Sequence, residues 1–278
     1  MTQTVRVGGV PEHFNLPWHL AIEDGCFATI DPDVEVVWLD FPGGTGEIMQ
    51  ALETGLVDIA TPLTEGVVTA IANGNPSELV TSWVDSPLHW GVFAAAESPA
   101  ETVSELRGER FAISRYGSGS ELMSRVMANE YQWELTNESF VVVGGLSGAV
   151  EALPAGNAEI FMWDKAMTQP FVDAGVFKAV GHYPTPWPSF MVAQSTKFGA
   201  AFPGLGEQLA NVAKVSAQEL LSSSVAANVI ASRFDLDNTE VSEWLSNVRW
   251  AAPGSSLDQN MIDEVADKMS EIGRIPAM

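Results

Sequence analysis

The segment from Arg115 to Ser120 holds an arginine, two glycines and two serines, and it follows an apolar run that predicts a β-strand. Where a strand leads into a helix, free backbone N–H groups and the positive helix end can hold an anion. Serine hydroxyls add donors, and a guanidinium group binds carboxylate, sulfonate or phosphate through paired N–H groups. We therefore expect this segment to bind a small polar or anionic molecule. The binding residues would be Arg115, Gly117, Ser118, Gly119 and Ser120.

The same segment differs from the two common nucleotide-phosphate motifs. It lacks the Gly-Lys-Ser/Thr ending of a P-loop, and the pattern GxGxxG does not occur in the chain. The alternative to ligand binding is structural: Ser118 or Ser120 would cap a helix while the glycines allow a tight turn. Both interpretations predict that a helix begins here.

Two further strand-to-helix corners have a similar composition. Gly44 and Thr45 follow the second expected strand, and Thr64 and Glu65 follow the third. In open α/β sheets, ligands bind in the crevice outside the carboxyl ends of the strands. We therefore expect all three corners to face one crevice and to contact the ligand. For Gly44 and Thr45, a cap and a tight turn without a ligand is the alternative.

Glu12 and His13 follow the first expected strand, at a position where a residue would line the crevice. A glutamate–histidine pair can move protons, and Glu65 stands in a similar position. These residues define the alternative function, an enzyme that uses Glu12, His13 or Glu65 as acid and base. A solvated loop pair is the simpler interpretation, so we expect ligand contact at Glu12 and His13 but assign no catalytic residue.

Nine tryptophans occur in the chain, and several of them fall beside predicted strand ends. Indole rings form flat walls for a ring or a cation. Core packing accounts for at least half of the nine, and Trp163 and Trp187 are the ones expected to wall the ligand. Prolines on both sides of Trp187 restrict its backbone, which favours a preorganised wall. The expected ligand is therefore polar or anionic, with a ring or another flat part.

Composition excludes several classes of function. The formal net charge is −23, so the chain repels the phosphates of nucleic acids and the surface of anionic membranes. The single cysteine, Cys26, forms no internal disulfide and no cysteine-rich zinc site. The histidines at positions 13, 19, 89 and 182 lack the spacing of a metal motif. We expect neither a metal nor a cofactor.

Strands and helices alternate over most of the chain, and helices dominate from about residue 203. The first four expected strands are joined by helices and predict a parallel series. The fold class is thus α/β, with mixed sheets flanked by helices and a helical C-terminal part. We expect an outer lobe of residues 1–89 and 190–278, an inserted inner lobe of residues 90–189, and a ligand cleft between the lobes.

An ordered set of short runs carries a resemblance to a known superfamily. The runs are Val10-Pro11-Glu12-His13-Phe14, Phe41-Pro42-Gly43-Gly44-Thr45-Gly46, Leu63-Thr64-Glu65-Gly66, Ser86-Pro87-Leu88-His89-Trp90, Ile113 to Ser120, Phe161-Met162-Trp163-Asp164 and Thr185-Pro186-Trp187-Pro188-Ser189. Together they resemble the type II periplasmic-binding-protein superfamily. The branch is that of the nitrate-, sulfonate- and taurine-binding proteins and the thiamine-pyrimidine-precursor (NMT1-like) proteins, and within it an uncharacterised leaderless subgroup. The resemblance covers about residues 4–200.

The resemblance implies a Venus-flytrap fold that closes two lobes on a small molecule. In such a protein, the loop from Arg115 to Ser120 is the inter-lobe anion loop, and Ser86 joins the expected ligand-binding residues. The implied role is that of the substrate-binding protein of an ABC transporter, with a transporter permease as partner. For the enzyme alternative, the resemblance implies a role in cofactor-precursor metabolism, because the superfamily includes enzymes such as the thiamine-precursor synthase. The cysteine-rich motif of that synthase is absent here, because Cys26 is the only cysteine.

Targeting signals give one further expectation. No apolar h-region of a signal peptide precedes the first expected strand. We therefore expect a cytoplasmic protein; the alternative is a periplasmic or extracytoplasmic protein whose leader has been removed. No run approaches the roughly 18 apolar residues of a membrane span, so no membrane insertion is expected.

Overall fold

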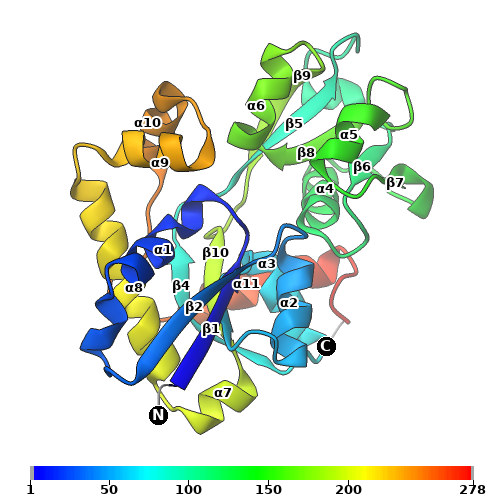
Figure 1. The fold of residues 1–278 in the computed structure, drawn as a ribbon. Helices are drawn as coiled ribbons and strands as arrows, with labels where there is room; N and C mark the ends of the chain where they lie inside the picture. Colours follow the sequence, from blue (N-terminus) through cyan, green and yellow to red (C-terminus); the bar gives the residue numbers. More distant parts are fainter. Residues whose placement is uncertain (1–2, 277–278) are drawn as a thin grey trace. The chain divides into compact units, whose positions relative to one another are not determined.

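The computed structural model describes residues 3–276, without the side chain of Ala166, and divides the chain into two compact units (Figure 1). Unit 1 consists of Met1–Ser86 and Trp187–Asp267, and unit 2 consists of Pro87–Pro186 and Lys268–Met278. The chain passes between the units after Ser86, after Pro186 and within helix α11 (Gln259–Glu271). The last passage differs from the sequence-based boundaries, which leave all of residues 190–278 in the outer lobe.

Unit 1 is built on a five-stranded sheet in the order β2-β1-β3-β10-β4. Its strands are β1 (Gln3–Gly9), β2 (Val34–Asp40), β3 (Ile59–Ala60), β4 (Ser77–Val84) and β10 (Phe190–Ser195). Strand β1 runs parallel to β2 and β3, whereas β10 runs antiparallel to β3 and β4. The first four strands share one direction, as expected, but β10 returns from unit 2 and lies antiparallel between β3 and β4. The mixed sheet expected for the fold class is confirmed.

Helices surround this sheet and start where the sequence supplies a suitable first turn. They are η1 (His13–Asn15), α1 (Leu16–Glu23), η2 (Cys26–Thr29), α2 (Thr45–Thr54), α3 (Thr64–Ala72), α7 (Thr196–Ala201), α8 (Leu205–Ser222), α9 (Ala226–Phe234), α10 (Asn238–Asn247) and the first part of α11. Helix α1 has a proline in its first turn, where no N–H partner is needed, and Asp237 caps α10 through two backbone N–H groups.

The starts of α2 and α3 approach each other closely in unit 1. A Cβ atom on Gly66, in the first turn of α3, would lie 2.3 Å from Thr45 Cγ2, in the first turn of α2. The Thr45 hydroxyl also accepts the N–H of Leu63, 3.0 Å away. Behind these helix starts, the core of buried side chains includes Ile48, Leu52 and Val67. Glycine at position 66 is therefore required for the packing that brings the two corners together.

Unit 2 contains a second five-stranded sheet, in the order β7-β6-β8-β5-β9. Its strands are β5 (His89–Ala95), β6 (Phe111–Ile113), β7 (Phe140–Val142), β8 (Ile160–Asp164) and β9 (Phe177–Pro184). Strand β6 runs parallel to β7 and β8, and β5 runs antiparallel to β8 and β9. Phe93, Phe161 and Phe177 form the centre of a buried apolar cluster on this sheet.

The helices of unit 2 are η3 (Val103–Leu106), α4 (Gly119–Glu130), η4 (Asn137–Ser139), α5 (Leu146–Ala152) and α6 (Lys165–Asp173). Helices α4, α5 and α6 follow the parallel strands β6, β7 and β8, whereas η3 and η4 precede β6 and β7. Among the helices of the described residues, η1, η2, η4, α6 and α7 are not predicted from the sequence. Helix α6 contains Pro170, a residue that signals a helix end in sequence, and it begins at Asp164, whose side chain accepts the N–H of Met167.

The close approach of α2 and α3 leads to a prediction for Gly66→Ala. The added methyl group collides with Thr45 Cγ2, so we expect the free energy of unfolding to fall by about 1–3 kcal/mol. Thr45→Ser removes that methyl group and keeps the hydroxyl that accepts the Leu63 N–H. In the Thr45→Ser background, Gly66→Ala should therefore cost clearly less. Urea unfolding of the four proteins measures the difference; an equal cost in both backgrounds would contradict the predicted collision.

Candidate functional site

The α4 loop, which we define as Arg115–Ser120, connects the carboxyl end of β6 to the first turn of α4. Ser118 is the N-cap of α4: its Oγ accepts the Glu121 N–H at 3.3 Å and donates to the Arg115 carbonyl at 2.7 Å. Gly117 has φ +79°, which favours glycine. Ser118 thus has the capping role that the structural alternative predicts.

Capping leaves other donors of the α4 loop available. Ser120 Oγ accepts the N–H of Ser114 at 3.0 Å, so this hydroxyl joins the loop to the end of β6. The backbone N–H groups of Gly119 and Ser120 lie in the first helical turn, and no acceptor for them is found within residues 3–276. First-turn N–H groups without a partner are the groups that bind anions at helix starts.

A buried carboxylate lies directly beside these donors and is missing from the sequence-based site. Glu121 is 0% exposed, and its Oε2 accepts the Gly117 N–H at 3.0 Å. Arg125 Nε lies 2.5 Å from Oε1, and Arg274 Nη2 lies 3.5 Å from Oε2. The Ser-x-x-Glu spacing from Ser118 to Glu121 is a capping signal visible in sequence. No local pattern points to Arg274, because it is distant along the chain.

In unit 1, the structure brings Thr45, Thr64, Glu65 and Trp187 into one corner. Trp187 Nε1 donates to Glu65 Oε2 at 2.9 Å. The Thr64 hydroxyl donates to the carbonyl of Pro188 at 2.5 Å, and the Thr64 N–H donates to the carbonyl of Ser189. The corner thus ties the start of α3 to the segment by which the chain re-enters unit 1. Gly44, with φ +73°, precedes Thr45 as the N-cap of α2.

Glu65 is a buried acid rather than an exposed carboxylate. Its side chain is 0% exposed, and Oε1 has no hydrogen-bond partner among the described residues. Burial raises the pKa of Glu65 to about 7, although the hydrogen bond from Trp187 opposes this shift. The side chain therefore keeps its proton up to about neutral pH. An uncharged Glu65 does not repel an anion.

His13 packs in an aromatic cluster and takes no part in the hydrogen bonds around Glu65. It is 2% exposed, stacks on Phe14 with ring centroids 4.7 Å apart, and meets Trp244 edge-on at 4.2 Å. Burial lowers the pKa of His13 to about 4, so the imidazole is neutral at physiological pH. Glu12 is half-buried and precedes η1. The ring of His13 contributes packing here, and its low pKa makes it a poor proton carrier near pH 7.

Two further expected residues have structural partners. Ser86 ends the first part of unit 1: its hydroxyl accepts the Arg249 N–H at 3.1 Å, and its carbonyl accepts both the N–H and the hydroxyl of Ser189. These bonds hold the chain at both entrances to unit 1. In unit 2, Trp163 is half-buried near the end of β8 and stacks on Phe161 at 5.3 Å.

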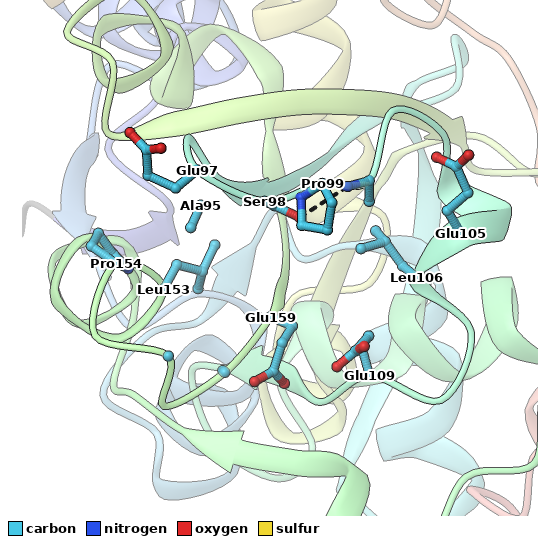
Figure 2. Close-up of a pocket in the computed structure, with 13 residues that line it drawn as sticks. Ala95, Glu97, Ser98, Pro99, Glu105, Leu106, Glu109, Leu153, Pro154 and Glu159 are labelled. Carbon is cyan, nitrogen blue, oxygen red and sulfur yellow. Dashed lines mark hydrogen bonds between the residues drawn. The ribbon is translucent and has the colours of Figure 1, made fainter.

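A cavity of about 550 Å³ lies in unit 2, away from the residues expected to bind a ligand (Figure 2). It is bordered by the end of β5 and by the segments that lead into β6 and β8. It therefore lies at the amino-terminal ends of β6 and β8, whereas the α4 loop follows the carboxyl end of β6. Its floor includes Leu106 and Leu153, and Glu97 and Glu109 are exposed at its border. Carboxylates at this border disfavour an anion, so the cavity does not replace the α4 loop as candidate site.

The part of the chain that the structure describes contains neither a metal-binding cluster nor a membrane-spanning helix. No group of three or more histidine, cysteine, aspartate or glutamate side chains is arranged to hold a metal ion. None of the helices within residues 3–276 combines the length and the apolar character needed to cross a membrane.

Comparison with known proteins agrees with this geometry. The model of the Ca3427-like periplasmic-binding-protein family matches residues 90–183. A putative aliphatic sulfonates-binding protein of Escherichia coli (strain K12) is 26% identical over 98 residues, which are 34% of this chain and 30% of that protein. The match thus spans under a third of the length of the curated relative.

Solved structures match over nearly the whole chain. The Candida albicans CA3427 gene product, described as having the generic periplasmic-binding-protein fold, gives a TM-score of 0.89 at 25% identity, with 99% of this chain and 92% of that chain covered. The alkanesulfonate-binding protein SsuA from Xanthomonas axonopodis pv. citri, bound to MOPS, gives 0.79 at 18% identity, covering 100% and 96%. With the two mixed sheets, these matches show that the chain has the periplasmic-binding-protein fold, and that its residues 90–183 resemble the Ca3427-like family of such proteins.

Proposed function

We propose that the protein binds a small solute carrying an oxyanion of the sulfonate, carboxylate or phosphate class, and that the α4 loop holds the oxyanion. The unpartnered N–H groups of Gly119 and Ser120 carry this proposal. Arg115 stands at the start of the same loop and supplies a guanidinium group. First-turn N–H groups and a guanidinium group bind an anion more strongly than a neutral solute.

The proposed role of unit 1 is to present the rest of the ligand with a corner that carries no charge. Thr45, Thr64 and the protonated Glu65 lie in one corner beside Trp187. Because Trp187 is buried and its N–H is bonded to Glu65, its ring is held in one orientation. In unit 2, the half-buried Trp163 would pack against a flat part of the ligand.

A transporter permease is the partner that this proposal implies. Sulfonate-binding proteins of the same fold are described as components of sulfonate transport, such as the putative sulfonate ABC transporter protein from Methylobacillus flagellatus KT, with a TM-score of 0.69 and 16% identity. We propose that the two lobes close on the solute and that the closed form is what a permease recognises.

The enzyme alternative receives no support from His13 and Glu65, two of the three residues proposed for it. His13 is buried among aromatic rings with a pKa of about 4, and Glu65 is fully buried under the indole of Trp187. General acid–base catalysis needs groups that reach the substrate and that titrate near the working pH. Glu65 meets only the second condition. Solute binding without turnover is therefore the function we propose.

The proposed oxyanion contact predicts that Arg115→Ala weakens binding of an alkanesulfonate such as butanesulfonate. Loss of a charged hydrogen-bonding partner should reduce affinity by about 10- to 100-fold, or about 1.5–3 kcal/mol, in isothermal titration. Arg107→Ala is a matched control, because Arg107 is an exposed arginine of the same unit outside the α4 loop. Equal affinities for wild type and Arg115→Ala would remove Arg115 from the site.

The buried acid predicts a defined dependence of stability on pH. The pKa of Glu65 is about 7 in the folded state and near 4.5 in the unfolded chain, so between these values the unfolded chain binds fewer protons. Stability should therefore fall as pH rises from about 4.5 to 7 and should lose nothing further from this group above pH 7. Glu65→Gln lacks this slope, and its stability relative to wild type should rise by roughly 3 kcal/mol over the interval.

Chemical denaturation of both proteins at intervals of half a pH unit measures this difference. Asp173→Asn, in the exposed last turn of α6, controls for the loss of one carboxylate. A constant difference between Glu65→Gln and wild type from pH 4.5 to 7 would show that Glu65 is already ionised in the folded protein.

A further inference from the structure

The buried carboxylate of Glu121 competes with any ligand for the α4 loop. Its Oε2 already accepts the Gly117 N–H, and the carboxylate lies in the first turn of α4, where a bound oxyanion would also be placed. Two negative groups this close repel each other strongly in a partly desolvated site. An anion therefore binds there only if the positive charge around Glu121 exceeds the single negative charge of its carboxylate.

Two arginines contact Glu121, and they come from different parts of the chain. Arg125 follows one turn later on α4, with its Nε 2.5 Å from Oε1, and its guanidinium group lies over the ring of Phe140 at 4.6 Å. Arg274 comes from the C-terminal segment, with its Nη2 3.5 Å from Oε2. Glu121 with Arg125 alone is a neutral pair. With Arg274, the cluster has a net charge of +1.

The C-terminal segment is fixed to α4 of unit 2 near both ends of that helix. Lys268 Nζ donates to Asn129 Oδ1 at 2.7 Å, near the last turn of α4. After α11 ends, Gly273 turns the chain with φ +72°, and the Arg274 N–H bonds back to the Met269 carbonyl at 2.8 Å. This turn directs Arg274 to the first turn of the helix, and its Nη2 lies 3.5 Å from the position a Cβ on Gly117 would take.

We propose that Arg274 is a specificity-determining residue of the α4 loop: by neutralising the buried Glu121 together with Arg125, it makes the loop net positive and so selects anionic ligands. This inference rests on the proposed function. Arg274 acts through Glu121 as a positioning and charge-balancing residue, and its side chain is 28% exposed. The C-terminal residues thereby become part of the ligand site although they are far from the α4 loop in sequence.

A charge-balancing role of Arg274 and a purely structural role lead to different expected results. If Arg274 acts by neutralising Glu121, removing the carboxylate makes the arginine unnecessary. If Arg274 served only to hold the C-terminal segment in place, removing the Glu121 charge would not restore what its loss removes. A double-mutant cycle between Arg274→Gln and Glu121→Gln distinguishes these cases.

The experiment is isothermal titration of butanesulfonate into wild type, Arg274→Gln, Glu121→Gln and the double variant, at low and at physiological salt. We expect Arg274→Gln to bind at least roughly tenfold more weakly than wild type, and Glu121→Gln to bind at least as tightly as wild type. The double variant should bind within about threefold of Glu121→Gln. Arg274→Lys keeps the charge and should stay close to wild type.

Arg233→Gln removes one positive charge from unit 1, where Arg233 pairs with the exposed Glu23, and should leave binding unchanged. Unchanged affinity of Arg274→Gln, or a double variant as weak as Arg274→Gln, would overturn the inference while wild-type binding still supports the proposed function. If Arg274→Gln does not fold, weaker binding by Glu121→Gln than by wild type overturns it as well. Absence of binding by wild type would overturn both.

Discussion

A helix that follows a parallel strand starts with backbone N–H groups that have no partner inside the helix. This constraint shapes both units of the protein, because the chain repeatedly passes from a strand end into a helix start. Ser118 satisfies part of it with its hydroxyl group at the start of α4, and the Thr45 hydroxyl accepts the N–H of Leu63, directly before α3. The carboxylate of Glu121 satisfies another part by accepting the Gly117 N–H. The groups that stay unpartnered, at Gly119 and Ser120, are those through which we propose that a solute is held.

The two units neutralise the buried acids at these helix starts in different ways. In unit 1, Glu65 at the α3 start is fully buried beside an indole N–H, and no cation among the described residues pairs with it, so it keeps its proton to about neutral pH. In unit 2, the acid of the α4 start is equally buried but lies against two arginines. Burial thus neutralises Glu65 by protonation, whereas arginines neutralise Glu121 and leave a positive surplus. An anion is compatible with both arrangements despite the net charge of −23 of the whole chain.

Sequence predicts those features of the fold that depend on neighbouring residues. The helices expected to begin at the three strand-to-helix corners agree with α2, α3 and α4, because caps, apolar spacing and helix-ending residues are all local signals. Helix α6 is not predictable in this way, since Pro170 in its interior gives the opposite signal. The place of β10 between β3 and β4 depends on strand pairing across more than a hundred residues, which no local pattern reports.

For the candidate site, sequence predicts where the loop and the helix start lie better than it predicts the charge of the side chains around them. The glycines and serines of the α4 loop follow from composition and position, yet the protonated state of Glu65 follows from burial, and the role of Arg274 from a contact with Glu121 across the chain. The measurement that most directly tests solute binding at the α4 loop is a crystal structure of the protein grown with an alkanesulfonate. Sulfonate oxygens should lie about 2.9 Å from the backbone nitrogens of Gly119 and Ser120. A sulfonate bound elsewhere, with those two N–H groups facing only water, would contradict the proposed site.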